Sequence, residues 1–203
     1  MKHNNIKFRN GNIIIIPIAE CYKDCFTLIK SDYYRILGKE VSSLYILLRL
    51  LCGPFASPLL WFRLCQYKGL FYFISKFIYR LTSIIHNVYI PSSTRIGYGF
   101  YIGHGICIVI NEGTIIGNNV NVSQFLNIGT NHNTPAKIAD NVYVGPGVCI
   151  VEDVEIGDSS TIGAGAVVTK DIPANATAVG VPAKVINYDK SGRYTGNRWT
   201  QLP

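Results

Sequence analysis

Hydrophobic positions in the second half of the chain recur every six residues. A second apolar side chain stands four positions after most of them, as in the step from Ile102 to Ile106 or from Ile116 to Val120. Neither the period of a helix nor the alternation of a simple strand produces this spacing, whereas a short fixed period is typical of a solenoid. Hexads of this form predict a parallel β-helix. They begin at Ile90, Ile96, Ile102 and Ile108, then at Ile110, Ile116, Val122 and Ile128, and then at Ile138, Val144, Ile150, Ile156, Ile162 and Val168.

The residues before the hexads have the pattern of helices. Residues 26–38 are amphipathic and end at a glycine, which commonly stops a helix. Ser42 or Ser43 is suited to cap a second helix that runs to Cys52, where the segment GPFASP ends it. Residues 59–87 are rich in aromatic side chains and are interrupted by one glycine. We expect these helices to pack across one end of the β-helix.

The pattern therefore predicts a mainly β protein in three parts. Residues 1–88 form a helical N-terminal subdomain, and residues 89–186 form the β-helix domain. Residues 187–203 are polar and have no period, so they are interpreted as a C-terminal tail. A chain of 203 residues has room for one domain and a subdomain of this kind.

Charge separates the two halves. Residues 1–95 contain 13 Lys and Arg against 4 Asp and Glu, a balance of +9, whereas residues 96–203 contain 6 against 8, a balance of −2. A basic, aromatic-rich half suits peripheral contact with an anionic membrane surface or an anionic substrate, and it is equally compatible with a solvated face around a helical core. The sequence has no nucleic-acid-binding motif, so nucleic acid is not an expected partner.

The sequence shows no pattern of a targeting or spanning segment. Its start has no signal-peptide cleavage site, and the longest run of the aromatic region without Lys, Arg, His, Asp or Glu, between Arg49 and Arg63, has 13 residues. That run is shorter than the roughly 20 residues that span a bilayer. The six cysteines lack metal or redox spacing. We therefore expect a cytoplasmic protein with free thiols, which works in solution or at the inner face of the membrane.

Several segments closely resemble one enzyme family. IGHGICIVIN, IGNNVNV and IGDSSTIGAGAVVTKDIPANATAVGVPAKVI are similar to the hexapeptide-repeat acyltransferases, nearest to the serine O-acetyltransferases and the related capsule or O-antigen sugar O-acetyltransferases. The resemblance is strong over residues 86–186 and weak before them. It implies a left-handed β-helix with three hexads per coil, a homotrimer with active sites between subunits, and acetyl-CoA as the co-substrate.

His104 is the candidate catalytic base. It is the third residue of its hexad and is expected to face outward. When the two extra residues between the first and second series of hexads are left out of the count, His104 aligns with Gln124 in the next coil. The resemblance places the family's catalytic histidine at His104, where a neutral imidazole removes the proton of an attacking hydroxyl. The serine acetyltransferases have an aspartate that orients this ring at the position of Tyr89. Tyr89, a backbone carbonyl or another subunit is therefore expected to orient His104.

A loop in the array offers groups for the acceptor. Ile128 and Ile138 are ten residues apart where six are expected, so four residues bulge from the wall. The bulge contains Asn131 and His132, and we expect both, with Gln124, to bind a polar acceptor. His3 and His86 lie outside the array, so the three histidines of a zinc site are not expected and no metal is predicted.

The end of the array is the expected coenzyme site. The resemblance implies that GAGA receives the pantetheine chain, that glycine-rich corners stabilise the oxyanion, and that threonine and lysine side chains meet the phosphates. A capped end coil with ordinary surface lysines is the alternative. Pro146 has no N–H, so one family contact is lost or moved there. The expected residues are Gly129, Gly145, Gly163, Ala164, Thr169, Lys170 and Lys184.

These features lead to three functional hypotheses. The first is acetyl transfer from acetyl-CoA to a sugar hydroxyl of a surface polysaccharide or its precursor. The second is serine O-acetylation in cysteine biosynthesis, against which the short helical part and Tyr89 argue. The third is a non-catalytic trimeric scaffold, which would need neither His104 nor the AVVTK and GVPAK segments.

Overall fold

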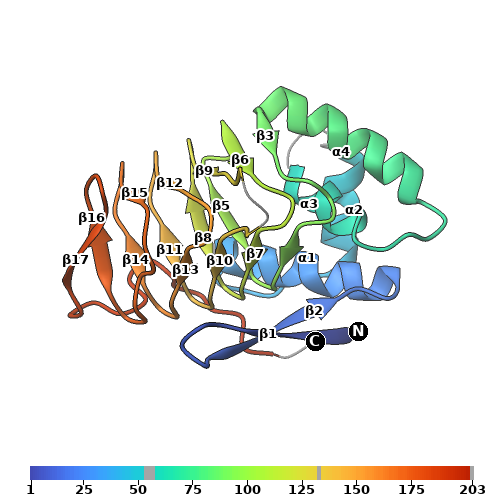
Figure 1. Ribbon diagram of the computed structural model, residues 1–203. Coiled ribbons are helices and arrows are strands. Elements are labelled where there is room, and N and C mark those ends of the chain that lie inside the picture. Colours follow the sequence, from blue (N-terminus) through green and yellow to red (C-terminus); the bar gives the residue numbers. More distant parts are fainter. Residues whose placement is uncertain (53–57, 132–133, 202–203) are drawn as a thin grey trace.

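A computed structural model describes residues 1–52, 58–131 and 134–201. Stacked β-helical coils form one part of the molecule, and helices lie across one end of the stack (Figure 1). Gly38 ends the first helix with a left-handed φ of 67°, and Ser42 Oγ accepts from the N–H of Tyr45 at 3.1 Å beside the second. Residues 53–57, which include most of the predicted stop GPFASP, lie outside the described residues. The helices are α1 (Tyr22–Leu37), α2 (Ser43–Cys52), α3 (Pro58–Leu64) and α4 (Tyr72–His86).

Three sheets form the walls of the β-helix. Sheet 1 contains β4 (Arg95–Ile96), β7 (Ile115–Ile116), β10 (Lys137–Ile138) and β13 (Glu155–Ile156). Sheet 2 contains β5 (Tyr101–Gly103), β8 (Asn121–Ser123), β11 (Tyr143–Val144), β14 (Thr161–Ile162), β16 (Thr177–Val179) and the antiparallel β17 (Lys184–Asn187). Sheet 3 contains β3 (Val88–Tyr89), β6 (Ile108–Ile110), β9 (Asn127–Ile128), β12 (Cys149–Ile150) and β15 (Val167–Val168).

The hexad positions build the core, as the pattern predicts. The aliphatic residues that open the hexads are buried, with the exception of the partly exposed Ile102. Ile106 is the second apolar residue of its hexad, a position at which an inward side chain is expected, but it is 49% exposed. Two residues inserted before it in its coil, His104 and Gly105, displace it outward.

A buried ion pair joins the helices to the first coil. The side chain of Arg63 on α3 is fully buried, and its Nε and Nη2 donate to the carboxylate of Asp32 on α1 at 2.8 and 3.0 Å. The same guanidinium donates to the carbonyl oxygens of Ile96 and Gly97 at 2.9 and 2.6 Å. Asp32 also accepts from the N–H of Phe100 at 2.8 Å. The helices therefore pack across one end of the β-helix, as expected.

Sheet 1 is covered by an N-terminal hairpin that the sequence did not predict. Residues assigned to a helical subdomain instead form the antiparallel strands β1 (Lys2–Lys7) and β2 (Ile13–Ile18). Alternating apolar side chains of the hairpin pack on Ile115 and Ala139 of the β-helix. An alternation of this kind buries one face of a strand, which explains why these residues are not helical. The packed hairpin residues are Ile6, Phe8, Ile14 and Ile16.

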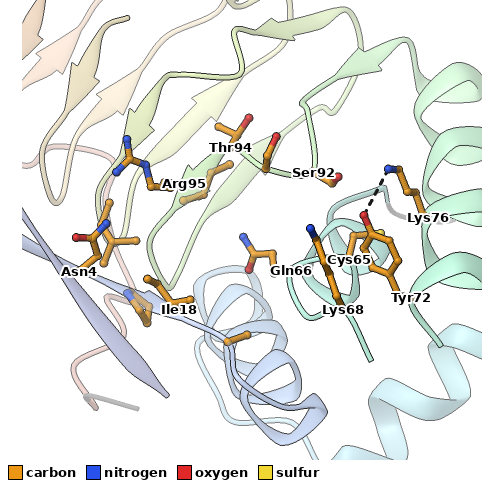
Figure 2. A pocket seen from close by; sticks show the side chains of 15 residues that line it. Asn4, Ile18, Cys65, Gln66, Lys68, Tyr72, Lys76, Ser92, Thr94 and Arg95 are labelled. Carbon is orange, nitrogen blue, oxygen red and sulfur yellow. Dashed lines mark hydrogen bonds between the residues drawn. The ribbon is translucent and has the colours of Figure 1, made fainter. Parts of the chain in front are cut away.

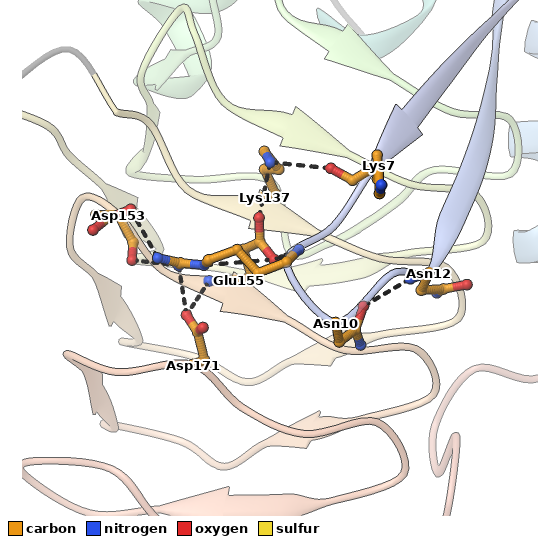
Figure 3. A network of polar contacts seen from close by, with 8 residues as sticks. Lys7, Asn10, Asn12, Lys137, Asp153, Glu155 and Asp171 are labelled. Carbon is orange, nitrogen blue, oxygen red and sulfur yellow. Dashed lines mark hydrogen bonds and ion pairs between the residues drawn. The ribbon is translucent and has the colours of Figure 1, made fainter.

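A polar network fixes the tip of this hairpin (Figure 3). Arg9 donates through its side chain to Asp153 at 3.0 Å and to Asp171 at 2.8 Å, and its backbone N–H donates to Glu155 at 2.6 Å. Lys137 donates to the other oxygen of Glu155 at 2.8 Å. Burial by itself would raise the pKa of Glu155, but these hydrogen bonds and positive charges outweigh it and lower the pKa below its ordinary value.

Protonation of Glu155 is expected to loosen the hairpin. A carboxyl whose pKa is lowered on folding contributes stability above its unfolded pKa of about 4.3, and this is lost as the pH falls through the folded value. Glu155→Gln should speed hydrogen exchange of residues 2–18 at pH 7 by removing about 1–3 kcal/mol of charge-assisted bonding. Exchange of the wild-type hairpin, measured by mass spectrometry, should approach that of the variant only below about pH 4. Equal protection of both proteins at pH 7 would contradict the prediction.

Sheet 2 is covered by the C-terminal residues, which are not a free tail. Trp199 is buried, its backbone N–H donates to the side-chain oxygen of Asn119 at 2.9 Å, and its ring centre lies 5.4 Å from that of Tyr34 on α1. Tyr194 stacks on Tyr143 of β11 with 4.7 Å between ring centres. The segment is non-periodic, as predicted, but it follows the outside of the coils back to α1.

Candidate functional site

Sheet 3 presents the open wall of the β-helix. Its outward residues form one row that runs from coil to coil, and all but the last are exposed. Apart from α4 beside its first strand, no described segment packs over this sheet in the way that the hairpin and the C-terminal residues cover the other two. The row consists of Tyr89, Val109, Asn127, Cys149 and Val167.

His104 lies at the corner between sheets 2 and 3. It follows β5 directly, its side chain is exposed, and its backbone is left-handed with a φ of 50°. The exposure agrees with the outward position that the hexad predicts. Its carbonyl oxygen accepts from the N–H of Ile106 at 2.7 Å, which closes a tight turn around Gly105. The turn leaves the imidazole exposed at the corner.

Gln124 is not the neighbour that sequence spacing predicted for His104. The N–H of Phe125 donates to the carbonyl of Ile106 at 3.2 Å, and in the next coil the N–H of Gly147 donates to Gln124 at 3.0 Å. These equivalent bonds place Ile106 in the position of Gln124. The two inserted residues are therefore His104 and Gly105 themselves, and they displace Ile106 outward. The six-residue count shows that an insertion exists but does not locate it.

Several predicted residues nevertheless share this corner. The N–H of Gly165 donates to Pro146 at 2.8 Å, in the same pattern, so Gln124, Pro146 and Ala164 stack below the His104 turn. Successive coils are about 4.8 Å apart, which sets Ala164 roughly 14 Å from the first coil along the axis. Ala164 is exposed, and a side chain added at Gly165 would meet nothing within 4 Å. An extended chain has room to lie against the backbone here.

Two of the predicted cofactor glycines have a packing reason for their identity. A Cβ at Gly145 would lie 2.9 Å from the backbone nitrogen of Ala164, and one at Gly163 would lie 2.6 Å from a methyl carbon of Val179. Both clashes arise from the close stacking of coils. The absence of side chains is therefore explained without a ligand, although both glycines lie at the corner that holds His104.

The second corner of sheet 3 holds another group of predicted residues. Gly129 and Asn131 line a pocket of about 310 Å³ on the outer wall. Thr130 Oγ1 donates to the Glu152 carboxylate at 3.1 Å, and the N–H of Asn131 donates to the same oxygen. His132 and Asn133 lie outside the described residues. Four extra residues separate β9 from β10, as the spacing predicts.

The predicted phosphate-binding residues lie toward the last coil. Thr169 and Lys170 are exposed after β15, on the same corner as Gly129. Lys184 is exposed in β17, where it pairs with Val179. The sequence segment that contains Lys184 therefore folds back as a hairpin onto sheet 2 at the end of the β-helix.

Tyr89 lies in a pocket of about 610 Å³ between α4 and sheet 3. Lys76 and Arg80 of α4 line it together with Val109. Sequence reasoning missed the two basic residues, although their spacing of four places both on one side of a helix. Tyr89 and His104 do not hydrogen-bond to each other within the described chain, so the predicted orienting contact is not made by this pair in one subunit.

Another pocket, of about 310 Å³, lies apart from all the predicted residues (Figure 2). It separates the hairpin and the start of α4 from the first coil, and Gln66 and Lys68 reach into it from below Ser92 and Thr94. None of its lining residues is a carboxylate. Across the described residues, no group of three or more His, Cys, Asp or Glu side chains is arranged to hold a metal ion.

The fold and the sequence comparisons define a class of transferase. Residues 135–170 match the family described as Bacterial transferase hexapeptide (six repeats). The serine acetyltransferase of Helicobacter pylori is 35% identical over 147 residues, covering 70% of this chain and 86% of the relative. That of Synechococcus elongatus is 30% identical over 79% of this chain and 68% of the relative. The crystal structure of the Brucella abortus serine acetyltransferase in complex with coenzyme A has the same fold, with a TM-score of 0.60 at 24% identity over 81% of this chain and 67% of that chain.

The protein is thus a hexapeptide-repeat acyltransferase. Within this class, the chain belongs to the family of the serine acetyltransferases. It is an acetyltransferase, as the sequence resemblance implied.

Proposed function

We propose that this chain transfers the acetyl group of acetyl-CoA to the hydroxyl of a small acceptor, with L-serine as the first candidate. The observation that carries the proposal is the similarity to serine acetyltransferases at 30–35% identity over most of the chain. This relationship favours serine over the sugar acceptor that the sequence features favoured. We assign this acetyl transfer to the cytoplasm, where acetyl-CoA is made and where the described cysteines would remain free thiols.

His104 acts as the general base in the proposed mechanism. A hydroxyl is a poor nucleophile at neutral pH, and an imidazole that removes its proton during attack makes it a good one. The acceptor oxygen forms a bond to the thioester carbonyl carbon, and collapse of the tetrahedral intermediate breaks the carbon–sulfur bond. The proton held by His104 then passes to the departing thiolate, so charge and protons balance.

The proposed cofactor path follows the corners on either side of sheet 3. Acetyl-CoA supplies the activated acyl group, and the open backbone at Ala164 and Gly165 receives its pantetheine chain. Thr169, Lys170 and Lys184 are exposed near the last coil, where they meet phosphates. The corners at Gly129, Gly145 and Gly163 are assigned to contact with the thioester. Their own N–H groups already donate to carbonyl oxygens of the next coil, so the oxyanion requires other donors.

Loss of the lysines is expected to weaken coenzyme binding. Lys170→Ala and Lys184→Ala should each raise the dissociation constant of acetyl-CoA about 5- to 100-fold, because each removes one charge-assisted contact to phosphate. Calorimetric titration measures the change, and Lys190→Ala, which alters another exposed lysine, is the control. Unchanged affinity in both variants would show that the coenzyme lies elsewhere.

A sugar hydroxyl is the second candidate acceptor. Tyr89 stands where the serine acetyltransferases have an acidic partner for the base, and the pocket around it is lined by Lys76 and Arg80. A phosphorylated precursor of a surface polysaccharide would match this charge. The same pocket also contains one carboxylate, Glu112, which accepts a hydrogen bond from the hydroxyl of Ser93.

Thiol release from acetyl-CoA distinguishes the acceptors. Wild-type protein is assayed with L-serine, with neutral sugars and with sugar phosphates, and each product is identified by mass spectrometry. Turnover of serine supports the first candidate, and turnover of a sugar without serine supports the second. No turnover with any acceptor, in a protein that binds acetyl-CoA, would contradict the proposed transfer.

The same proposal includes a homotrimer built on sheet 3. Val109 is 42% exposed on this open wall, and a site completed by a neighbouring subunit would supply the ring-orienting group that Tyr89 does not provide within one chain. We expect a trimer in analytical ultracentrifugation at micromolar concentration, and dissociation of that trimer by Val109→Lys. A wild-type monomer would contradict the assembly.

A further inference from the structure

The outer face of α4 is apolar. Six of its large aliphatic and aromatic side chains are 36–82% exposed, and at 100° per residue they fall within an arc of about 120°. The inner face of the helix, packed on α3 and β3, instead carries Ser75, Tyr79 and Thr82. A surface helix normally turns its apolar stripe toward the core, so α4 is reversed. The α4 face consists of Phe73, Ile74, Phe77, Leu81, Ile84 and Ile85.

Positive charge borders the α4 face. Lys76 and Arg80 are exposed and follow one flank of the helix beside Phe73 and Phe77. Residues 41–111 contain six Lys or Arg and no Asp or Glu, and Glu112 is the one carboxylate among the residues that line the pocket beside Lys76 and Arg80. Figure 1 shows α4 on the outside of the helical end, away from the hairpin.

We propose that the α4 face docks the protein onto an anionic lipid bilayer. A helix with an apolar arc of this width and a basic flank lies in the plane of the membrane, with its apolar side chains at the acyl boundary and its lysine and arginine at the headgroups. At 15 residues α4 has a length of about 22 Å, and none of the described helices is long and apolar enough to cross a membrane. Surface docking is the membrane contact that remains for such a helix.

Charge favours lipid over a second copy of the chain. Two α4 faces packed together would bring two Lys76 and two Arg80 side chains to one interface, and each set has Glu112 as the one carboxylate in the pocket that it lines. Like charges at an interface without partners are unfavourable. Anionic headgroups supply the missing negative charge.

Docking would also set the position of the candidate acceptor pocket. Lys76, Arg80 and Ile84 of α4 line the pocket that contains Tyr89. An α4 face inserted into lipid therefore places this pocket at the membrane surface. Sheet 3 continues from there, coil by coil, away from the helical end.

Cosedimentation with vesicles tests the proposal. The wild-type chain is mixed with vesicles of phosphatidylcholine alone or with added phosphatidylglycerol, at low and high salt. We expect binding only to the anionic vesicles and weaker binding at high salt. F73S/F77S and K76Q/R80Q should each lower the partition coefficient about 10-fold or more. Ile186→Ser and Lys190→Gln, which change an exposed apolar residue and an exposed lysine elsewhere, should not.

A fluorescent variant reports insertion directly. The native Trp61 and Trp199 are buried, so the emission of Phe77→Trp is the signal that should shift to shorter wavelength with anionic vesicles. Absence of wild-type binding, or binding that the four substitutions leave intact, would overturn the proposal. The proposal would also be overturned if the wild type did not bind vesicles and F73S/F77S changed the oligomeric state measured by light scattering. The α4 face would then be a protein interface. Acetyl transfer to a soluble acceptor by F73S/F77S should remain at wild-type rates, which separates this test from that of the proposed function.

Discussion

Replacement of His104 by asparagine is expected to lower the rate of acetyl transfer by at least about 10²–10⁴-fold while coenzyme binding and the fold are retained. The imidazole is exposed on an inserted turn, and its backbone contacts do not require the ring. Asparagine also tolerates the left-handed backbone that this turn imposes at φ 50°. His104→Asn therefore removes the base without straining the corner, which makes it a better variant than His104→Ala.

Steady-state thiol release and calorimetric binding of acetyl-CoA measure the two halves of this prediction. Tyr89→Phe is the matched control, because a phenol that shapes the acceptor pocket is not the base and its loss should cost less. His132→Ala should chiefly raise the apparent KM for the acceptor, as expected of a residue in the acceptor loop. If His104→Asn turned over at the wild-type rate, His104 would be only a wall residue and the proposed mechanism would fail.

Replacement of Asp32 by asparagine is expected to lower the free energy of unfolding by about 3–5 kcal/mol, because it leaves the fully buried Arg63 without its counter-charge. Arg63→Met should cost at least as much, since it also strands the carbonyls of Ile96 and Gly97. Denaturant unfolding followed by circular dichroism gives both values. The helices and the first coil should be lost together, because the ion pair connects them.

An exposed ion pair provides the control for Asp32. Glu20 pairs with Lys2 at 2.8 Å, but their side chains are 41% and 76% exposed, so solvent screens the interaction. Glu20→Gln should leave the unfolding midpoint unchanged within error. A similar small effect for Asp32→Asn would mean that the helical end is held mainly by apolar packing.

The hexad pattern was sufficient to predict the walls of the β-helix. Each residue that opens a hexad faces the narrow interior of the β-helix. Its hydrophobicity in the sequence therefore indicates that it is buried. The same reasoning predicted helices, their ends at Gly38 and Cys52, and an outward His104. The hexad pattern gave the wrong position for Ile106 and the wrong neighbour for His104. The spacing shows how many residues are inserted in a coil, but it does not show which residues bulge outward.

The hexad pattern and the motifs were therefore enough to predict the repeat, most of the inward and outward residues, and the family of acyltransferases. Which wall of the β-helix stays open depends on how the rest of the chain packs on the coils. The hairpin of residues 2–18 covers sheet 1 and the C-terminal segment with Trp199 covers sheet 2, which leaves sheet 3 with Tyr89 and both corners of candidate residues free. These covers depend on contacts between residues more than 50 positions apart, such as Asn118 with Ile15 at 2.9 Å and Tyr143 with Tyr194. No local period encodes such contacts, because they arise from surfaces that exist only after the coils have stacked.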